Sequence, residues 1–305
     1  MVVLLGLALG SSAIAVNAFG VGDRFDHLLD RVDRILAGPP PDRPAPSTVL
    51  VTDPEEEESE APEVTPSPTP LPSASGSLDP AATPVPTPVP TPTPTPAPVR
   101  KAVDVDIVKK PKSVFASEVK DTWCSPAGVQ MTLAVLGLAD TSKAFQAELQ
   151  RKVRTWESYD DSHNGDWGPA AMALALDHYG APGYEVRAYK TRNGALRDAA
   201  KAIQATNSPV VLLAWRGAHT WVMTGFRADA DPSVFKDAKV SGAYILDPWY
   251  PRVSSIWGRS DPPGTFQDTS EMERNYLKWR RPEGHYKDRD DLYVAVVPTL
   301  TAPER

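Results

Sequence analysis

The uneven distribution of prolines is the strongest constraint on how this chain can fold. Of the 33 prolines in 305 residues, 20 lie between residues 39 and 98, among threonine, serine, alanine and an acidic block at Glu55–Glu58. Such a segment lacks the apolar surface that would offset the entropy of ordering it. Residues 39–99 are therefore predicted to be a disordered, extended spacer. One folded domain is expected over residues 100–305, which is long enough for one sizeable core.

The chain begins with an apolar run in which no charged residue occurs before Asp23. At ~1.5 Å per residue, a helix over residues 2–22 just spans ~30 Å of hydrocarbon. We expect residues 1–22 to be a retained transmembrane anchor, and a cleaved signal peptide is the alternative. Residues 23–38 are predicted to form a short amphipathic helix. Both alternatives predict an exported protein, at the cell surface or outside the cell.

The charge distribution argues against a nucleic-acid partner. Up to residue 99 there are 4 Lys or Arg against 13 Asp or Glu, and the whole chain carries a net charge of −7. The remainder of the chain therefore carries about +2, so the acidity belongs to the spacer. Because the folded part has no basic excess, we expect no nucleic acid among its partners.

The only cysteine, Cys124, lies where an irregular segment becomes a predicted helix. Apolar residues recur after it at three- and four-residue steps, and Pro126 fits the first helical turn. Asp121 or Thr122 is expected to cap this turn. A thiol in the positive end of a helix dipole favours the thiolate, which is the nucleophilic form. A small core residue is the alternative, and a single cysteine excludes an internal disulfide and a multi-cysteine zinc site.

Hydrophobic periodicity places helices early and strands late in the folded part. Helices are predicted over residues 124–137, 142–154, 169–179, 194–206 and 268–281, and strands over residues 103–108, 184–188, 210–215, 220–226, 242–246 and 292–297. This order predicts an α+β fold with an N-terminal helical part and an antiparallel sheet.

Two further residues complete a set that is typical of thiol hydrolases. His219 lies at the turn between two predicted strands, and Asp247 follows the next strand, directly before Pro248. Adjacent antiparallel strands hold such residues on a rigid sheet edge. The imidazole would accept the thiol proton and later protonate the leaving amine, while the acid orients the imidazole. Singly, each residue also fits an ordinary turn; with Cys124 they predict a catalytic triad.

The Cys-Ser-Pro, Gly-Ala-His and Leu-Asp-Pro motifs that contain Cys124, His219 and Asp247 occur in one order along the chain. In these motifs the chain resembles the papain-fold cysteine peptidases of the bacteriocin-processing type, family 39, and their bacterial relatives, over about residues 112–298. The resemblance implies a papain-like fold, Cys124 as nucleophile, His219 as general base and Asp247 as orienting acid. It also implies a bacterial protein with a peptide or protein substrate, no cofactor and no metal.

One departure from that family concerns stabilisation of the oxyanion. Papain-like enzymes carry a glutamine about six residues before the cysteine, and this chain has Glu118 there. A carboxylate would repel the developing charge, where losing one donor already costs about 10²–10³ in rate. Three alternatives keep the domain active: Glu118 is protonated, or its side chain points away, or backbone N–H groups alone donate to the oxyanion. In the fourth, the domain is a weak catalyst or an inactive binding module in contact with the cell wall. A cell-wall peptide amidase is a further alternative, against which Asp247-Pro248 argues.

Aromatic residues near these motifs are candidates for a substrate groove. The four candidates, for which packing in the core is the alternative, are Trp123, Trp167, Trp221 and Trp249.

A polar loop over residues 160–168 hints at a metal but matches no ligand spacing. Its polar residues are Asp160, Asp161, His163, Asn164 and Asp166. In the calcium-loop template Ala171 stands where the bidentate glutamate is required, so we predict a solvated loop and no metal site.

Overall fold

The computed structural model describes residues 28–29, 32, 34–52, 97–162, 167–281 and 283–299. The predicted anchor over residues 1–22 and the spacer residues 53–96 lie outside this set. In the part that is described, no helix combines the length and apolar character needed to cross a membrane.

An eight-stranded sheet forms the centre of the domain. Seven strands follow the order β1-β3-β10-β4-β5-β6-β9, and the eighth, β2, pairs with the C-terminal end of β5. Its strands are β1 (Val49–Val51), β2 (Val103–Asp106), β3 (Tyr184–Tyr189), β4 (Val210–Ala214), β5 (His219–Ala228), β6 (Val240–Leu246), β9 (Thr265–Asp268) and β10 (Tyr293–Pro298). A separate ribbon pairs β7 (Val253–Ser254) with β8 (Gly258–Arg259). Every pair is antiparallel except β1 with β3, as an α+β fold requires.

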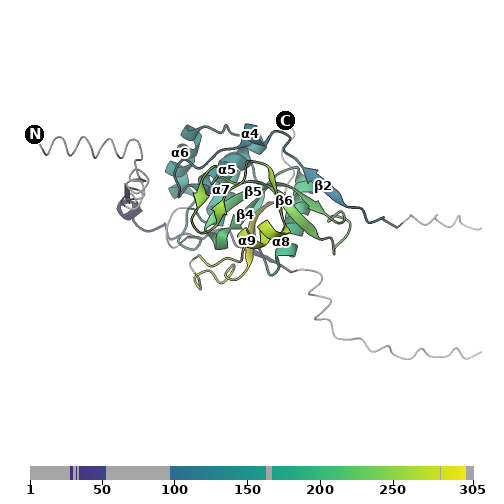
Figure 1. The fold of residues 1–305 in the computed structure, drawn as a ribbon. Coiled ribbons are helices and arrows are strands. Elements are labelled where there is room, and N and C mark those ends of the chain that lie inside the picture. The colour runs from purple at the N-terminus through teal and green to yellow at the C-terminus, as the bar shows by residue number, and fades with distance from the viewer. Residues whose placement is uncertain are drawn as a thin grey trace, which may run out of the picture.

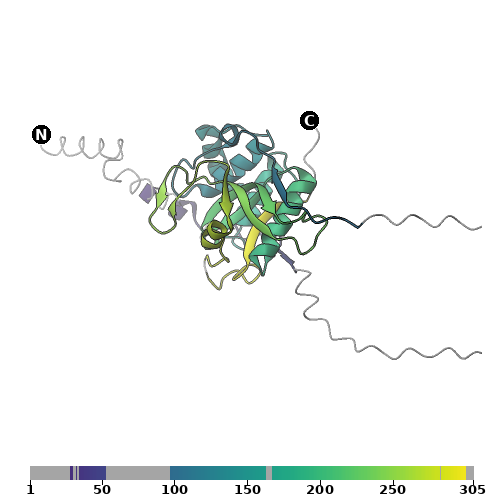
Figure 2. The same ribbon diagram turned by 45° about the vertical axis from the view of Figure 1, so that its right-hand side comes forward.

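Helices cover both faces of this sheet (Figures 1 and 2). One layer holds α5 (Cys124–Val135), α6 (Lys143–Lys152) and α7 (Pro169–His178), with the short α4 (Pro111–Val114) and η2 (Val153–Thr155) beside it. The other layer holds α8 (Arg192–Thr206) and α9 (Thr269–Asn275). Mixed helix and strand layers of this kind are consistent with a papain-like domain.

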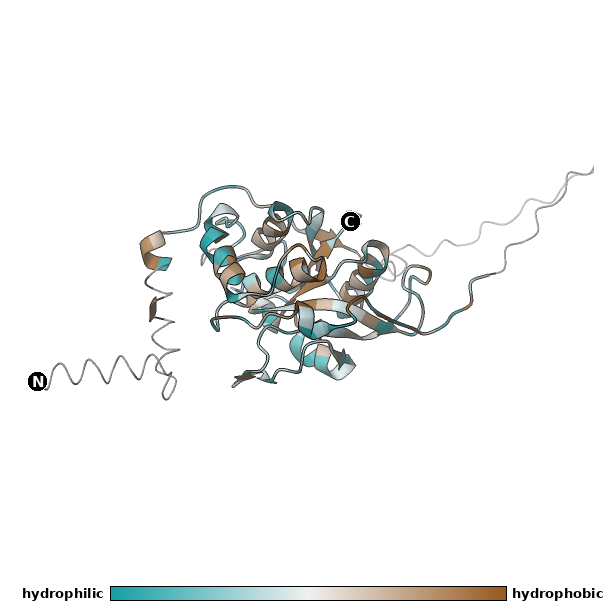
Figure 3. Cartoon of the chain, turned by 90° about the horizontal axis from the view of Figure 1, so that it is seen from above, coloured by the Kyte–Doolittle hydropathy of each residue, from teal (hydrophilic) through white to brown (hydrophobic). Residues whose placement is uncertain are grey.

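The central strand β4 shows why two helix layers are needed. All five of its residues are buried. Val211 and Leu213 pack into the cluster under α5 and α7, whereas Val210, Leu212 and Ala214 pack into the cluster under α8. Successive side chains of a strand point to opposite faces, so a continuous apolar strand must be covered twice. Figure 3 shows apolar residues gathered on the strands and on the helix surfaces that face them.

The last predicted helix is shorter than the sequence pattern suggests. Residues 268–281 were expected to be helical, but α9 ends at Asn275. The next residue, Tyr276, has an extended backbone (φ −88°, ψ 93°) and is fully buried, and its hydroxyl donates a hydrogen bond to the Val294 carbonyl at 3.2 Å. Burying the Tyr276 ring against β10 stabilises the domain more than another turn of α9 would. β10 itself inserts between β3 and β4.

The first residues of the predicted spacer lie against the domain. β1 pairs with β3 and is itself the edge strand on that side of the sheet, and Pro40 is buried. Arg43 donates from Nε to the Glu157 carbonyl at 2.8 Å, and the Tyr159 N–H donates to the Pro41 carbonyl at 3.0 Å. Prolines lack an N–H donor but keep an accepting carbonyl. A proline-dense segment can therefore dock through its carbonyls. Residues 39–52 were expected to be disordered with the rest of the spacer, but they lie against the domain.

We predict that Leu50→Pro releases this segment from the sheet. Proline removes an N–H and does not fit a paired strand, so the edge of β3 becomes exposed to solvent. Hydrogen exchange should accelerate for at least one backbone amide of residues 187–190, measured by mass spectrometry on the full chain. Leu50→Ala, which keeps the backbone donor, should leave exchange unchanged. Equal exchange in both variants would show that β1 contributes no pairing.

Candidate active site

Cys124 is the first residue of α5. The N-cap residue is Trp123, whose own side chain makes no capping hydrogen bond. The first N–H groups of a helix have no partner within the helix. The backbone donors of the first turn of α5 therefore lie beside the half-buried Cys124 thiol, whose Sγ lies 3.9 Å from the Ala218 carbonyl oxygen.

A strained turn between β4 and β5 positions His219. Its three consecutive residues Trp215, Arg216 and Gly217 have φ values of 50°, 63° and 85°. The left-handed region disfavours side chains, most of all bulky ones. The Trp215 ring compensates by stacking on the His219 imidazole, with centroids 4.0 Å apart, and its Nε1 donates to Asn275 Oδ1 at 3.0 Å. The contacts of the Trp215 ring therefore stabilise the strained turn and also fix the position of the His219 imidazole.

His219 and Asp247 form a buried pair. His219 is 2% exposed, and its Nε2 lies 2.7 Å from Asp247 Oδ1, which also accepts the Trp249 N–H at 2.9 Å. Burial lowers the pKa of His219, but the charge and hydrogen bond of Asp247, together with Cys124, outweigh it and raise that pKa to about 10. The Asp247 carboxylate thus favours the protonated form of the imidazole. Because Nε2 is taken by Asp247, Nδ1 remains for the sulfur.

Close packing between α5 and β5 brings the thiol to the imidazole. One polar atom each from Glu118, Cys124 and His219 lie within 4.8 Å of one another. A Cβ on Gly128 of α5 would come within 2.3 Å of Thr220 Cγ2 on β5, so only glycine allows this approach. Cys124 and His219 thus meet because the helix has no side chain at position 128.

Glu118 points into the site. It is 3% exposed, its Oε1 accepts from Arg252 Nη1 at 2.8 Å, and its Oε2 is buried without a hydrogen-bond partner. Burial raises the pKa of Glu118 to about 8; the positive charges of His219 and Arg252 lower it, and Asp247 and Asp121 raise it further. The alternative in which this side chain points away does not hold, and at neutral pH the protonated carboxyl can donate a hydrogen bond.

A cavity of about 350 Å³ opens onto Cys124 and His219. Of the four candidate groove tryptophans, Trp167 and Trp249 line it. Trp221 is 3% exposed within the core, and the Trp123 ring lies under the Lys120 ammonium, 5.3 Å from its centroid. The substrate groove suggested by the sequence therefore retains two of its four aromatic candidates.

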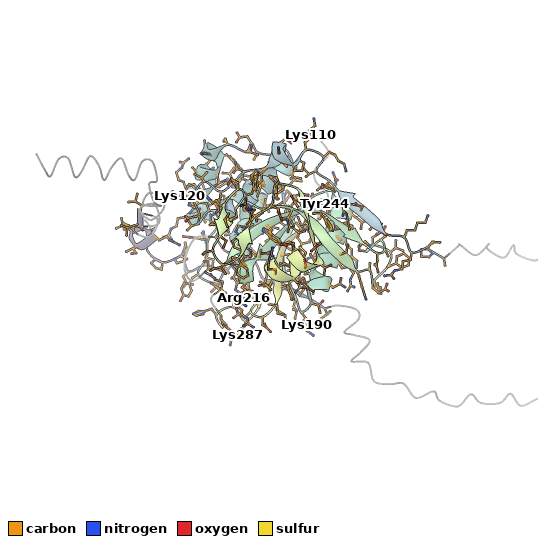
Figure 4. The ribbon with its side chains drawn as sticks, in the orientation of Figure 1. Lys110, Lys120, Lys190, Arg216, Tyr244 and Lys287 are labelled. Carbon is orange, nitrogen blue, oxygen red and sulfur yellow. The ribbon has the colours of Figure 1, made fainter. Side chains whose placement is uncertain are left out.

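A larger cavity, of about 870 Å³, is lined among others by Arg192, Arg227 and Met272 and contains no cysteine or histidine. It lies near Tyr244, which stacks under Arg227. Figure 4 shows Lys120, four residues before Cys124 in the sequence, and Tyr244 on different sides of the domain. Size does not identify the reactive site here, because the nucleophile lies in the smaller cavity.

The polar loop holds a helix cap. Residues 163–166 lie outside the described part, but Asp161 is buried and accepts the N–H groups of Ala170 and Ala171 at 3.2 and 2.9 Å. It also forms an ion pair with Arg289 at 3.2 Å. Asp161 therefore caps α7 and neutralises a buried cation. The sequence missed this role, as it missed Arg252 and Trp215, because Arg289, Glu118 and Asn275, their respective ion-pair or hydrogen-bond partners, lie far along the chain.

A thiol at a helix start beside a buried His–Asp pair on an antiparallel sheet is the arrangement that nucleophilic catalysis by a cysteine needs. The model of the peptidase C39-like family matches residues 103–281, which include Glu118 and all three candidate catalytic residues. The chain therefore belongs to this cysteine peptidase family. Searches of curated proteins and of solved structures gave no significant match.

We predict that Gly128→Ala destabilises the domain and that Thr220→Ser relieves the effect. The new methyl meets Thr220 Cγ2, and such overpacking costs about 1–3 kcal/mol. In the Thr220→Ser background the clash is absent, and alanine in a helix gains about 1 kcal/mol over glycine. Urea unfolding followed by tryptophan fluorescence should show this coupling in a double-mutant cycle. Additive effects would mean that α5 and β5 are not in the contact described.

We predict that Glu118→Gln removes an alkaline loss of activity. In the wild type, kcat/KM should fall as pH rises through about 8, because the Glu118 carboxyl ionises and stops donating. The glutamine amide donates at every pH. Above pH 8, kcat/KM of the variant should therefore exceed that of the wild type by about 10–10²-fold, within the rate effect of one oxyanion donor. The half-buried Glu148→Gln, away from the cavity, serves as control and should keep the wild-type profile. An unchanged alkaline limb in Glu118→Gln would exclude this role.

Proposed function

We propose that this protein is an exported cysteine peptidase that hydrolyses a peptide amide bond through Cys124, His219 and Asp247. One observation carries the proposal: a half-buried thiol and a buried, Asp-paired imidazole share a 350 Å³ cavity, with polar atoms within 4.8 Å. The family match supports the same reaction class. We further propose that residues 2–22 tether the protein to the membrane of a bacterial cell, so that the domain acts at the cell surface.

The proposed acylation uses the resting ion pair. The Cys124 thiolate attacks the substrate carbonyl carbon, and the carbonyl π electrons move to oxygen as the C–S bond forms. The His219 imidazolium then protonates the amide nitrogen as the C–N bond breaks. The products of this step are a thioester and a free amine. Asp247 keeps the ring oriented while its charge changes.

Deacylation needs a neutral imidazole, and acylation provides it. After acylation the sulfur carries no charge, so its contribution to the raised pKa of His219 is lost. His219, having given up its proton, accepts one from water as the water oxygen attacks the thioester carbonyl. The C–S bond breaks, the carboxylic acid leaves, and the thiolate–imidazolium pair is restored.

Two kinds of donor are proposed for the oxyanion. The start of α5 offers the backbone N–H groups of Cys124 and Ser125, aided by the positive end of the helix dipole. The protonated Glu118 carboxyl supplies a side-chain donor in the place where related enzymes use glutamine. Preorganised donors in a site shielded from water stabilise the oxyanion without reorganisation.

The same Glu118 favours a second candidate function. If its carboxylate form, paired with Arg252, dominates in the working environment, the domain is a weak catalyst or a binding module at the cell wall. The two candidates differ in the reactivity of Cys124, because a binding module has no need of an activated thiol.

We predict rapid alkylation of Cys124 by iodoacetamide at mildly acidic pH. An ion-paired thiolate reacts there, whereas an ordinary thiol does not. His219→Ala should label slowly, and mass spectrometry of the labelled peptide gives both rates. On a peptide library, Cys124→Ala should abolish turnover, and Asp247→Ala should lower kcat by up to about 10⁴-fold. Slow labelling of the wild type together with no cleavage would favour the binding module.

A further inference from the structure

Glu118, Cys124 and His219 together form a donor set suited to a metal ion. Each offers one ligand atom, a carboxylate oxygen, a sulfur and a ring nitrogen, and these three atoms lie within 4.8 Å of one another. Glu118 and His219 are buried and Cys124 is half-buried. Among the described residues, this is the one group of three or more His, Cys, Asp or Glu side chains that converge in this way.

The chemistry of the three ligands selects zinc. Zinc takes thiolate, imidazole and carboxylate ligands in tetrahedral geometry at about 2.0–2.3 Å, which places neighbouring ligand atoms about 3.3–3.6 Å apart. The three atoms therefore need to close by no more than about 1.5 Å. Three protein ligands leave the fourth position open to the 350 Å³ cavity for a water molecule. A thiolate and a carboxylate together neutralise the charge of the ion.

The surrounding contacts already orient the ligands. His219 Nε2 is held by Asp247 at 2.7 Å, which leaves the other ring nitrogen free to bind metal, as in carboxylate–histidine–zinc arrangements. Glu118 Oε1 is held by Arg252, while Oε2 is buried and has no hydrogen-bond partner. A buried carboxylate oxygen without a partner is costly unless something pairs with it. A zinc ion bound to Oε2 would satisfy it.

Glu118 separates this site from a simple Cys–His pair. A glutamine at this position would offer only a neutral amide oxygen, a poor ligand for zinc. In the polar loop over residues 160–168, Asp161 has no carboxylate oxygen left for a metal ion. Its side chain is already bound by Arg289 and by two backbone N–H groups.

We propose that Glu118, Cys124 and His219 bind one Zn²⁺ ion and that this ion blocks the nucleophile reversibly. Binding itself requires only the three side chains. The blocking effect rests on the proposed peptidase function, because a zinc-bound sulfur cannot attack a carbonyl and a zinc-bound imidazole cannot transfer a proton.

Zinc titration of the full chain against a chromophoric chelator tests the site directly. We expect one ion per chain in the wild type. Glu118→Gln should weaken affinity by at least about 10–100-fold, the loss that even an outer-shell partner of a metal ligand brings. Cys124→Ser should abolish tight binding. Asp160→Asn, an exposed acid in the polar loop, is the matched control and should bind as the wild type does.

Cobalt substitution supplies a readout that is independent of activity. Co²⁺ in the wild type should give thiolate-to-metal charge-transfer absorption, and Cys124→Ser should lose it. Circular dichroism of each variant checks that it is folded. Absence of tight zinc binding in the wild type, or equal affinity in folded Glu118→Gln, would overturn the proposal. Zinc binding without any peptide hydrolysis would leave the site standing and remove the peptidase function instead.

Discussion

The contact between α5 and β5 is the constraint on which the site depends. Cys124 begins the helix and His219 begins the strand, and neither residue reaches the other unless the two backbones pack closely. Gly128 makes this possible, because a Cβ there would meet Thr220. The strand is held from both sides by β4 and β6. A rigid central strand is therefore the reference against which the helix places its thiol.

Electrostatics at the site follow from burial. His219 and Asp247 are nearly inaccessible and keep opposite charges by pairing, while Glu118 is buried beside them with one oxygen paired to Arg252 and the other without a partner. Taking a charge out of water is costly unless it is compensated. The Glu118 carboxyl therefore has two ways of being stable, by holding a proton or by pairing its unpartnered oxygen with a cation. A glutamine, as in related enzymes, has neither property.

Local sequence patterns predicted most of the regular structure. The helix after Cys124, the helix after Pro169 and the strands that bear His219 and precede Asp247 follow from apolar periodicity and from proline and glycine positions. The prediction was wrong where a distant partner decides the conformation. Tyr276 leaves its helix to pack against β10. No local pattern contains such information.

The sequence by itself determined the α+β class, the order of the three candidate catalytic residues and the presence of an acid in place of a glutamine. These are properties of residue type and spacing, which do not depend on folding. Only the tertiary structure decided that Glu118 faces the thiol, that Arg252 and Trp215 support the site, and that residues 38–52 dock on the domain. The Glu118–Arg252 ion pair, the Trp215–Asn275 hydrogen bond and the docking of residues 38–52 each join groups far apart in the sequence, and only packing of the whole domain brings such groups together.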